Sequence, residues 1–100
     1  MPASSYQVQI PVNIFREGEH FVAHSPVLDL SSSGRTFEEA QTRFKEALDM
    51  FLGDLIERGT LEEVLESHGW YKVINGGHPR LVPPKLVKSV EQEALISFGA

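Results

Sequence analysis

Residues 31–40 read SSSGRTFEEA and place a glycine and several hydroxyl groups directly before a helical pattern. Thr36 and Glu39 have the spacing of a capping box, in which the hydroxyl accepts from a backbone N–H and the glutamate reaches back. The stretch lacks the second glycine and the lysine of a phosphate-binding loop, and Ser31–Ser33 do not form a nucleophile elbow. It therefore predicts a strand that turns at Gly34 into a capped helix, rather than an anion-binding or catalytic loop.

The helix predicted after Thr36 is the strongest element of the sequence. Apolar residues recur at helical spacing over residues 37–56, and Gly59 is the residue type that ends helices. A helix of about 22 residues is about 33 Å long at 1.5 Å per residue, which is enough to cross a small sheet. A second capping box at residues 60–63 predicts a short helix that ends at Gly69.

Strand patterns precede the long helix. Residues 6–15 alternate apolar and polar side chains, which is the period of a half-buried strand, and Pro11 indicates an edge or a bulge. A polar hairpin connection containing Gly18 follows. Residues 21–27 then predict a second strand, and residues 28–34 predict a short third one.

Further extended segments follow the short helix. Residues 70–74 predict a strand and residues 75–77 a turn, whereas residues 78–87 contain three prolines and predict an irregular extended segment. Residues 90–98 alternate as a strand does, but Leu86, Val90 and Ala94 also have helical spacing; of the two, we favour a strand.

Strands, a long helix and further strand together indicate an α+β fold. We expect a small, mainly antiparallel sheet in β-β-β-α-β order, with a short second helix and the long amphipathic helix packed on one face. Residues 1–70 would form the core domain, and residues 71–100 would complete the same domain or mediate oligomerisation. An exposed strand edge predicts self-association as a homodimer or tetramer.

Composition sets broad limits on the class of protein. The chain has 100 residues, 41% of them hydrophobic, which suits one small domain, and it has no cysteine for disulfides or thiolate zinc sites. The N-terminal MPASSYQVQI has neither a basic stretch nor an apolar run, so we expect no signal peptide. No apolar window approaches the roughly 20 residues that cross a bilayer. We expect a soluble, cytoplasmic protein without membrane association.

Charge is distributed unevenly along the chain. Residues 1–69 hold five Lys and Arg against twelve Asp and Glu, a net charge of −7, whereas residues 70–100 hold four against two, a net charge of +2. An acidic body disfavours nonspecific binding to phosphate backbones and would attract a basic protein partner. The basic side chains of the second part keep a nucleic-acid-binding alternative open, and they are Lys72, Arg80, Lys85 and Lys88.

The titratable residues do not predict a catalytic, cofactor-binding or metal site. His20 and His24 would lie about 13 Å apart on an extended strand, too far to share one zinc ion. His68 has a structural position at a helix end, and His78 has no acidic neighbour in sequence. Only Asp29 lies beside the predicted sheet without a capping role, and one carboxylate does not make a two-metal nuclease. We therefore expect no enzyme, with a degenerate nuclease based on Asp29 as the least favoured alternative.

The middle of the chain resembles the HicB-like antitoxin family of toxin–antitoxin systems, over roughly residues 6–70. That family has a P-x-L-D stretch, a strand of small residues, and G-x-T-x-E-E-A opening a helix rich in E-A-L. The matching residues here are Pro26, Leu28, Asp29, Gly34, Thr36, Glu38, Glu39, Ala40, Glu46, Ala47 and Leu48. The resemblance implies a reduced ribonuclease-H-like fold without nuclease acids, and the first predicted strand indeed contains no carboxylate.

The resemblance also implies a partner and a departure from the family. HicB-like proteins bind HicA-type toxins, which are small basic mRNA-cleaving proteins, and the acidic body suits that protein–protein interaction. Many members add a DNA-binding module, but only 30 residues follow Trp70 here, with five glycines and prolines before Lys85. We therefore do not expect direct DNA binding. The alternative is a stand-alone nucleic-acid-binding or protein-interaction domain without a cognate toxin.

Overall fold

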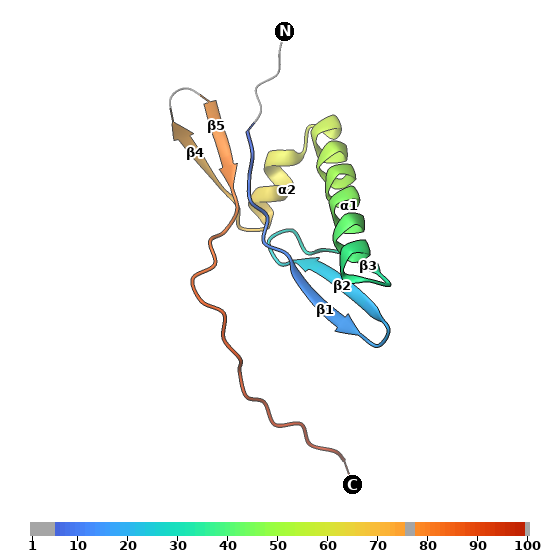
Figure 1. Ribbon diagram of the computed structural model, residues 1–100. Helices are drawn as coiled ribbons and strands as arrows, with labels where there is room; N and C mark the ends of the chain where they lie inside the picture. The colour runs from blue at the N-terminus through green and yellow to red at the C-terminus, as the bar shows by residue number, and fades with distance from the viewer. Residues whose placement is uncertain (1–5, 76–77, 100) are drawn as a thin grey trace.

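The computed structural model describes residues 6–75 and 78–99 and has the predicted α+β architecture (Figure 1). A three-stranded antiparallel sheet comes first, with the order β1-β2-β3. Its strands are β1 (Asn13–Glu17), β2 (His20–Ser25) and β3 (Leu30–Gly34). The helices α1 (Phe37–Arg58) and α2 (Leu61–Ser67) follow, and a two-stranded antiparallel sheet of β4 (Tyr71–Asn75) and β5 (His78–Val82) comes last.

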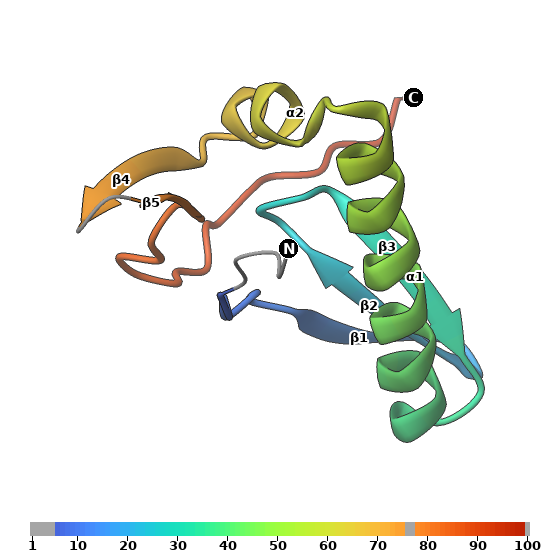
Figure 2. The ribbon, with the colours of Figure 1, turned by 90° about the horizontal axis from the view of Figure 1, so that it is seen from above.

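Helix α1 begins and ends as the sequence predicts. The Thr36 hydroxyl oxygen accepts a hydrogen bond of 3.0 Å from the Glu39 N–H, which satisfies one of the free donors at a helix start. Gly59 ends the helix in the left-handed conformation at φ 71°. The helix packs mainly over β3 and β2 on one face of the sheet (Figure 2). The prediction of one long amphipathic helix on one sheet face is confirmed.

The second predicted capping box does not form. Thr60 makes no side-chain cap hydrogen bond at the start of α2, and its ψ of 9° is not extended. The end of α1 also removes the reciprocal bond, because the Thr60 N–H donates to the Leu55 carbonyl at 2.9 Å and leaves the Glu63 carboxylate no N–H to reach back to. The end of one helix therefore fixes the backbone where the next one begins.

The core consists of two adjoining clusters. Ala23, Ala40 and Phe44 form one between the sheet and α1. The second cluster lies around Trp70 and contains Val27, Leu28, Leu65 and Leu81. Leu30 and Leu48 pack against both clusters and connect them. Burial of the valine, leucine and phenylalanine side chains among them contributes about 1.5–3 kcal/mol each.

The first strand is shorter than predicted. Backbone pairing begins at Asn13, and residues 6–12 lie outside any strand. Their alternation still predicts burial, because Val8, Ile10 and Val12 pack against the core while Gln7 and Gln9 are exposed. Pro11 cannot donate to a ladder, so the pairing with β2 starts beyond it.

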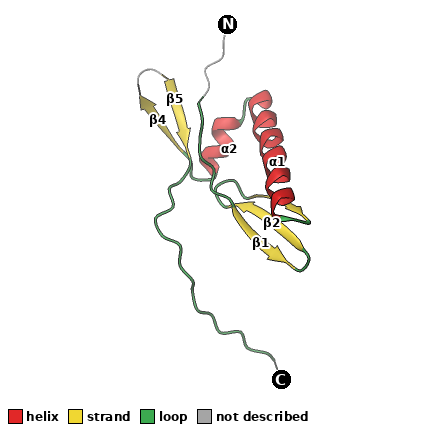
Figure 3. Ribbon diagram, in the orientation of Figure 1, coloured by secondary structure: helices red, strands yellow, loops and turns green. Residues whose placement is uncertain are grey.

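The C-terminal predictions require two corrections. Residues 78–82 form β5 rather than an irregular segment, and Pro79 is tolerated because a two-stranded ribbon has only edge strands. Residues 90–98 form no strand, because no neighbouring strand supplies hydrogen-bond partners; residues 83–99 are an extended chain (Figure 3). The predicted turn at 75–77 falls partly on Gly76 and Gly77, which lie outside the described residues.

The described part of the chain contains no helix that is both long and apolar enough to span a membrane.

Candidate functional site

The residues of the family motif occupy two separate places, one at each end of β3. Pro26 and Asp29 lie in the turn before β3, whereas Gly34, Thr36, Glu39 and Ala40 lie where β3 turns into α1. Five steps of extended strand, from Asp29 to Gly34, separate the two places by about 16 Å. The motif therefore forms two local structures and not one site.

The junction between β3 and α1 explains its small residues. A Cβ at Gly34 would lie 2.5 Å from the Ala40 backbone nitrogen and 2.8 Å from the Glu39 carbonyl carbon, so any larger residue would displace the helix. Ala40 itself is 0% exposed and belongs to the core cluster with Ala23 and Phe44. Glu39 Oε1 accepts from the Arg35 N–H at 3.0 Å, one residue before the N-cap. These residues position the helix on the sheet.

The turn before β3 is fixed by Trp70. The Trp70 indole N–H donates a buried hydrogen bond of 2.8 Å to the Val27 carbonyl. Asp29 has a positive φ of 52° and its Oδ1 lies 3.2 Å from His24 Nε2. The Asp29 side chain is 84% exposed, so this pair contributes little to stability. Sequence reasoning did not single out Trp70 as a partner of this turn, because the two are 43 residues apart.

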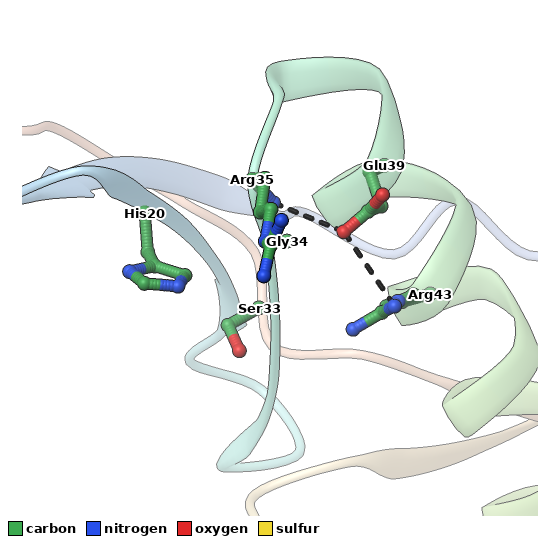
Figure 4. Close-up of a pocket in the computed structure, with 6 residues that line it drawn as sticks. All are labelled: His20, Ser33, Gly34, Arg35, Glu39 and Arg43. Atoms are coloured by element: carbon green, nitrogen blue, oxygen red, sulfur yellow. Dashed lines mark hydrogen bonds and ion pairs between the residues drawn. The ribbon is translucent and has the colours of Figure 1, made fainter.

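A polar hollow lies beside the junction, between β2, β3 and the first turns of α1 (Figure 4). It is lined by His20, Ser33, Gly34, Arg35, Glu39 and Arg43. Glu39 connects two of these residues, because the Oε1 atom that accepts from the Arg35 N–H also lies 3.5 Å from Arg43 Nη2. Among the described residues no hydrogen bond joins Ser33 to His20, so this geometry does not form the nucleophile–base pair that hydrolysis needs. Arg35 and Arg43, the two arginines that line this hollow, were not singled out from the sequence.

The described residues 6–75 and 78–99 contain no group of three or more His, Cys, Asp or Glu side chains that could hold a metal ion. His24 and Asp29 lie together but supply only two potential ligands. Zinc sites use at least three protein ligands. His20 and His24 lie at opposite ends of the β1–β2 ladder, opposite Glu17 and Asn13 respectively.

The four predicted basic contact residues do not form one patch. Lys72 is paired in the ladder with Leu81, and Arg80 with Val73, so their side chains leave the hairpin on opposite faces. Lys72 pairs with Glu62 of α2, and that hydrogen bond raises the pKa of the Lys72 amine. The Arg80 guanidinium lies 5.4 Å from the Tyr6 ring centroid. Lys85 and Lys88 are exposed on the C-terminal chain.

The outer face of α1 gathers acidic side chains. At 3.6 residues per turn, Glu38, Glu46, Asp49 and Glu57 fall within about 100° of one another, and all four are exposed. The buried residues Ala40, Phe44 and Leu55 lie on the opposite side. Within the described residues Asp49 is paired with Lys45 at 2.7 Å, whereas the three glutamates form no ion pair. We call these four acids the acidic face.

Gly53 lies in the middle of the acidic face. A Cβ there would meet nothing within 4 Å, so the packing of this chain does not require a glycine. Glycine inside a helix costs roughly 0.5–1 kcal/mol relative to alanine. A glycine at this place lets another molecule approach the helix backbone closely.

Comparison with known proteins found no match to a family model, to a curated protein or to a solved structure.

Proposed function

We propose that this chain is a HicB-like antitoxin, which binds and neutralises a HicA-type mRNA-cleaving toxin by covering its RNA-binding surface. The sequence resemblance between residues 26 and 48 supplies the family, and the acidic face of α1 is the observation that carries the mode of binding. Complementary charge speeds the encounter of two proteins and selects the partner.

The acidic face suits a basic partner for two physical reasons. Three of its glutamates are not neutralised by an ion pair within the described chain, so their field is available to a cationic surface. Gly53 removes a side chain from the centre of the face. The lysines and arginines with which a toxin binds RNA would contact the acidic face instead of the phosphate groups of the RNA.

The function is tested by charge reversal on the acidic face. We expect the protein to form a stable complex with the small basic product of the adjacent gene and to restore growth when the two are co-expressed. Glu46→Lys with Glu57→Lys should weaken that complex at least about tenfold, equivalent to 1.4 kcal/mol, mainly through slower association.

The matched control is Glu17→Lys with Glu19→Lys, which changes the net charge equally near the β1–β2 turn. We expect this variant to retain nearly full affinity. Equal losses in both variants would contradict a role for the acidic face, and a toxin that is not neutralised by the unaltered protein would contradict the function itself.

Gly53→Ala separates binding from folding. The alanine should raise the free energy of unfolding by roughly 0.5–1 kcal/mol because it favours the helix, yet it should weaken the toxin complex. A variant that is more stable and binds equally well would show that no partner approaches the helix at Gly53.

The nucleic-acid-binding alternative predicts an affinity for RNA or DNA that falls steeply with salt. The separation of Lys72 from Arg80 on the hairpin does not favour it. Titration of single-stranded and double-stranded RNA at low salt distinguishes the two functions, since an antitoxin of this type needs no such affinity.

A further inference from the structure

The C-terminal arm, which we define as residues 85–99, exposes a large apolar surface. Every residue of the arm is exposed, and its large apolar side chains have exposed fractions between 67% and 95%. These side chains are Leu86, Val87, Val90, Leu95, Ile96 and Phe98. Segments that stay disordered are poor in such residues, and exposed apolar surface of this extent marks a contact. The arm therefore has the composition of a segment that becomes buried.

Strand β1 offers an unpaired edge. It pairs with β2 on one side, and in the described residues no strand pairs with its other side. The free N–H and C=O groups of an edge strand are a template for another strand. Core residues lie directly behind this edge, because Val12 and Ile14 pack against the cluster of Ala23, Ala40 and Phe44. Both remain only half-buried, since α1 packs mainly over β3 and β2.

The arm has the pattern that this edge requires. One face of an extended chain holds Val90, Ala94, Ile96 and Phe98 together with Gln92, and the other holds Glu91, Glu93, Leu95 and Ser97. A strand added beside β1 with its apolar face toward α1 would continue the layer that Val12 and Ile14 begin. Its glutamates would then point to solvent on the open face of the sheet.

The arm of the same copy is directed away from this edge. Pro83 and Pro84 are half-buried, and Pro84 lies 3.7 Å from where a Cβ of Gly69 would be. Two consecutive prolines hold the chain extended. Figures 1 and 2 both show the arm running apart from β1 after this point. Its 15 residues span about 50 Å when extended, and the longest dimension of the chain is 64 Å.

From these observations we propose that two copies of the chain exchange arms, each arm pairing with the free edge of β1 in the other copy. The exchange is symmetric, because each copy gives its own arm and accepts the arm of the other. It therefore closes into a dimer in which the free edge of β1 is paired in both copies. The β4–β5 hairpin is a poorer acceptor, because the side chains of Tyr71, Lys72, Val73 and Ile74 are all exposed. The inference is independent of the proposed function, and its tests use the isolated protein.

Molar mass measured by sedimentation gives the first test. We expect the unaltered protein to be a dimer at micromolar concentration and the Ala94→Pro variant to be a monomer, because proline removes a ladder donor from the arm. The variant should keep its helical circular dichroism and unfolding midpoint at low concentration, since Ala94 is exposed. An unaltered protein that is monomeric, or a variant that is still dimeric, would overturn the proposal.

Disulfide cross-linking gives the second test and identifies the acceptor. The chain has no cysteine, so single-cysteine variants can be mixed in pairs. Asn13→Cys on β1 points to the open face of the sheet, so it should cross-link to Glu93→Cys or Ser97→Cys on another copy. We expect this reaction to be at least tenfold faster than the reaction of Glu57→Cys, on the outer face of α1, with the same arm variants. Equal rates would overturn the assignment to β1. In a double variant, a disulfide that forms within one chain at high dilution would place the arm on its own β1 and also overturn the exchange.

Discussion

Residues 6–12 and residues 90–98 are both extended segments that alternate their side chains, yet one belongs to the core and the other is exposed along its whole length. Val8, Ile10 and Val12 pack against buried residues, whereas Ile96 and Phe98 are 79% and 92% exposed. Neither segment takes part in the backbone–backbone hydrogen bonds of the described residues. The difference shows that alternation sets which side chains can be buried together, while the surface behind them decides whether they are.

For residues 6–12 that surface is the cluster around Trp70. Val8 and Ile10 rest on this cluster, and the Tyr6 hydroxyl binds the backbone of Leu81, which is part of it. The arm has no such cluster behind it in the same chain. In our proposal, β1 of a second copy provides the missing surface.

The largest expected effect comes from removing the cluster behind residues 6–12. Trp70→Ala deletes a side chain that is 5% exposed and leaves the Val27 carbonyl without its donor. We expect it to lower the free energy of unfolding by about 3–5 kcal/mol. Urea unfolding followed by circular dichroism measures the change. Trp70→Phe should cost less because it keeps an aromatic ring in the core, and equal losses would mean that the hydrogen bond and the extra size of the indole account for the whole effect.

A matched pair of substitutions tests the two segments directly. Ile10→Ala should lower the free energy of unfolding by roughly 1–2 kcal/mol, below the 2–5 kcal/mol of a fully buried isoleucine. Ile96→Ala should change it by less than about 0.5 kcal/mol at concentrations where the protein is monomeric. The fluorescence of Trp70, the only tryptophan, reports both. Similar losses at the two positions would contradict the contrast between the segments.

The smallest expected effect concerns the anchor of residues 6–12. The Tyr6 hydroxyl accepts from the Leu81 N–H at 2.8 Å and donates to the Leu81 carbonyl at 3.4 Å. Tyr6→Phe removes both bonds and should cost about 1 kcal/mol. The expected loss appears as a lower urea midpoint with an unchanged slope. An unchanged midpoint would show that apolar contact alone holds this segment.

The sequence predicts local structure well where one stretch carries all the information. Thr36, Glu39 and Gly59 define α1 without help from the rest of the chain, and the structure confirms its ends. Gly34 is predicted as a turn, but the structure adds that its Cβ would meet the backbone of α1. Thr60 fails as a capping box because its backbone is not extended and its N–H is bonded to the end of α1, neither of which the capping pattern contains.

Features that depend on distant partners were not predictable. The Trp70–Val27 hydrogen bond joins residues that are 43 positions apart, and β5 forms despite Pro79 because β4 pairs with it. Residues 90–98 have a strand pattern and no strand, since a strand needs a neighbour. The acidic face follows from the helical spacing of its four carboxylates, but the hollow between Arg35 and Arg43 needed the fold.

Hydrogen exchange at increasing protein concentration tests the central claim most directly, because it reports on each segment separately. We predict that amides in residues 90–98 and in β1 gain protection together as the concentration rises through the dimerisation range, while α1 stays protected throughout. Residues 90–98 that exchange at the unprotected rate at every concentration would contradict the account, as would protection that is already complete in the monomer.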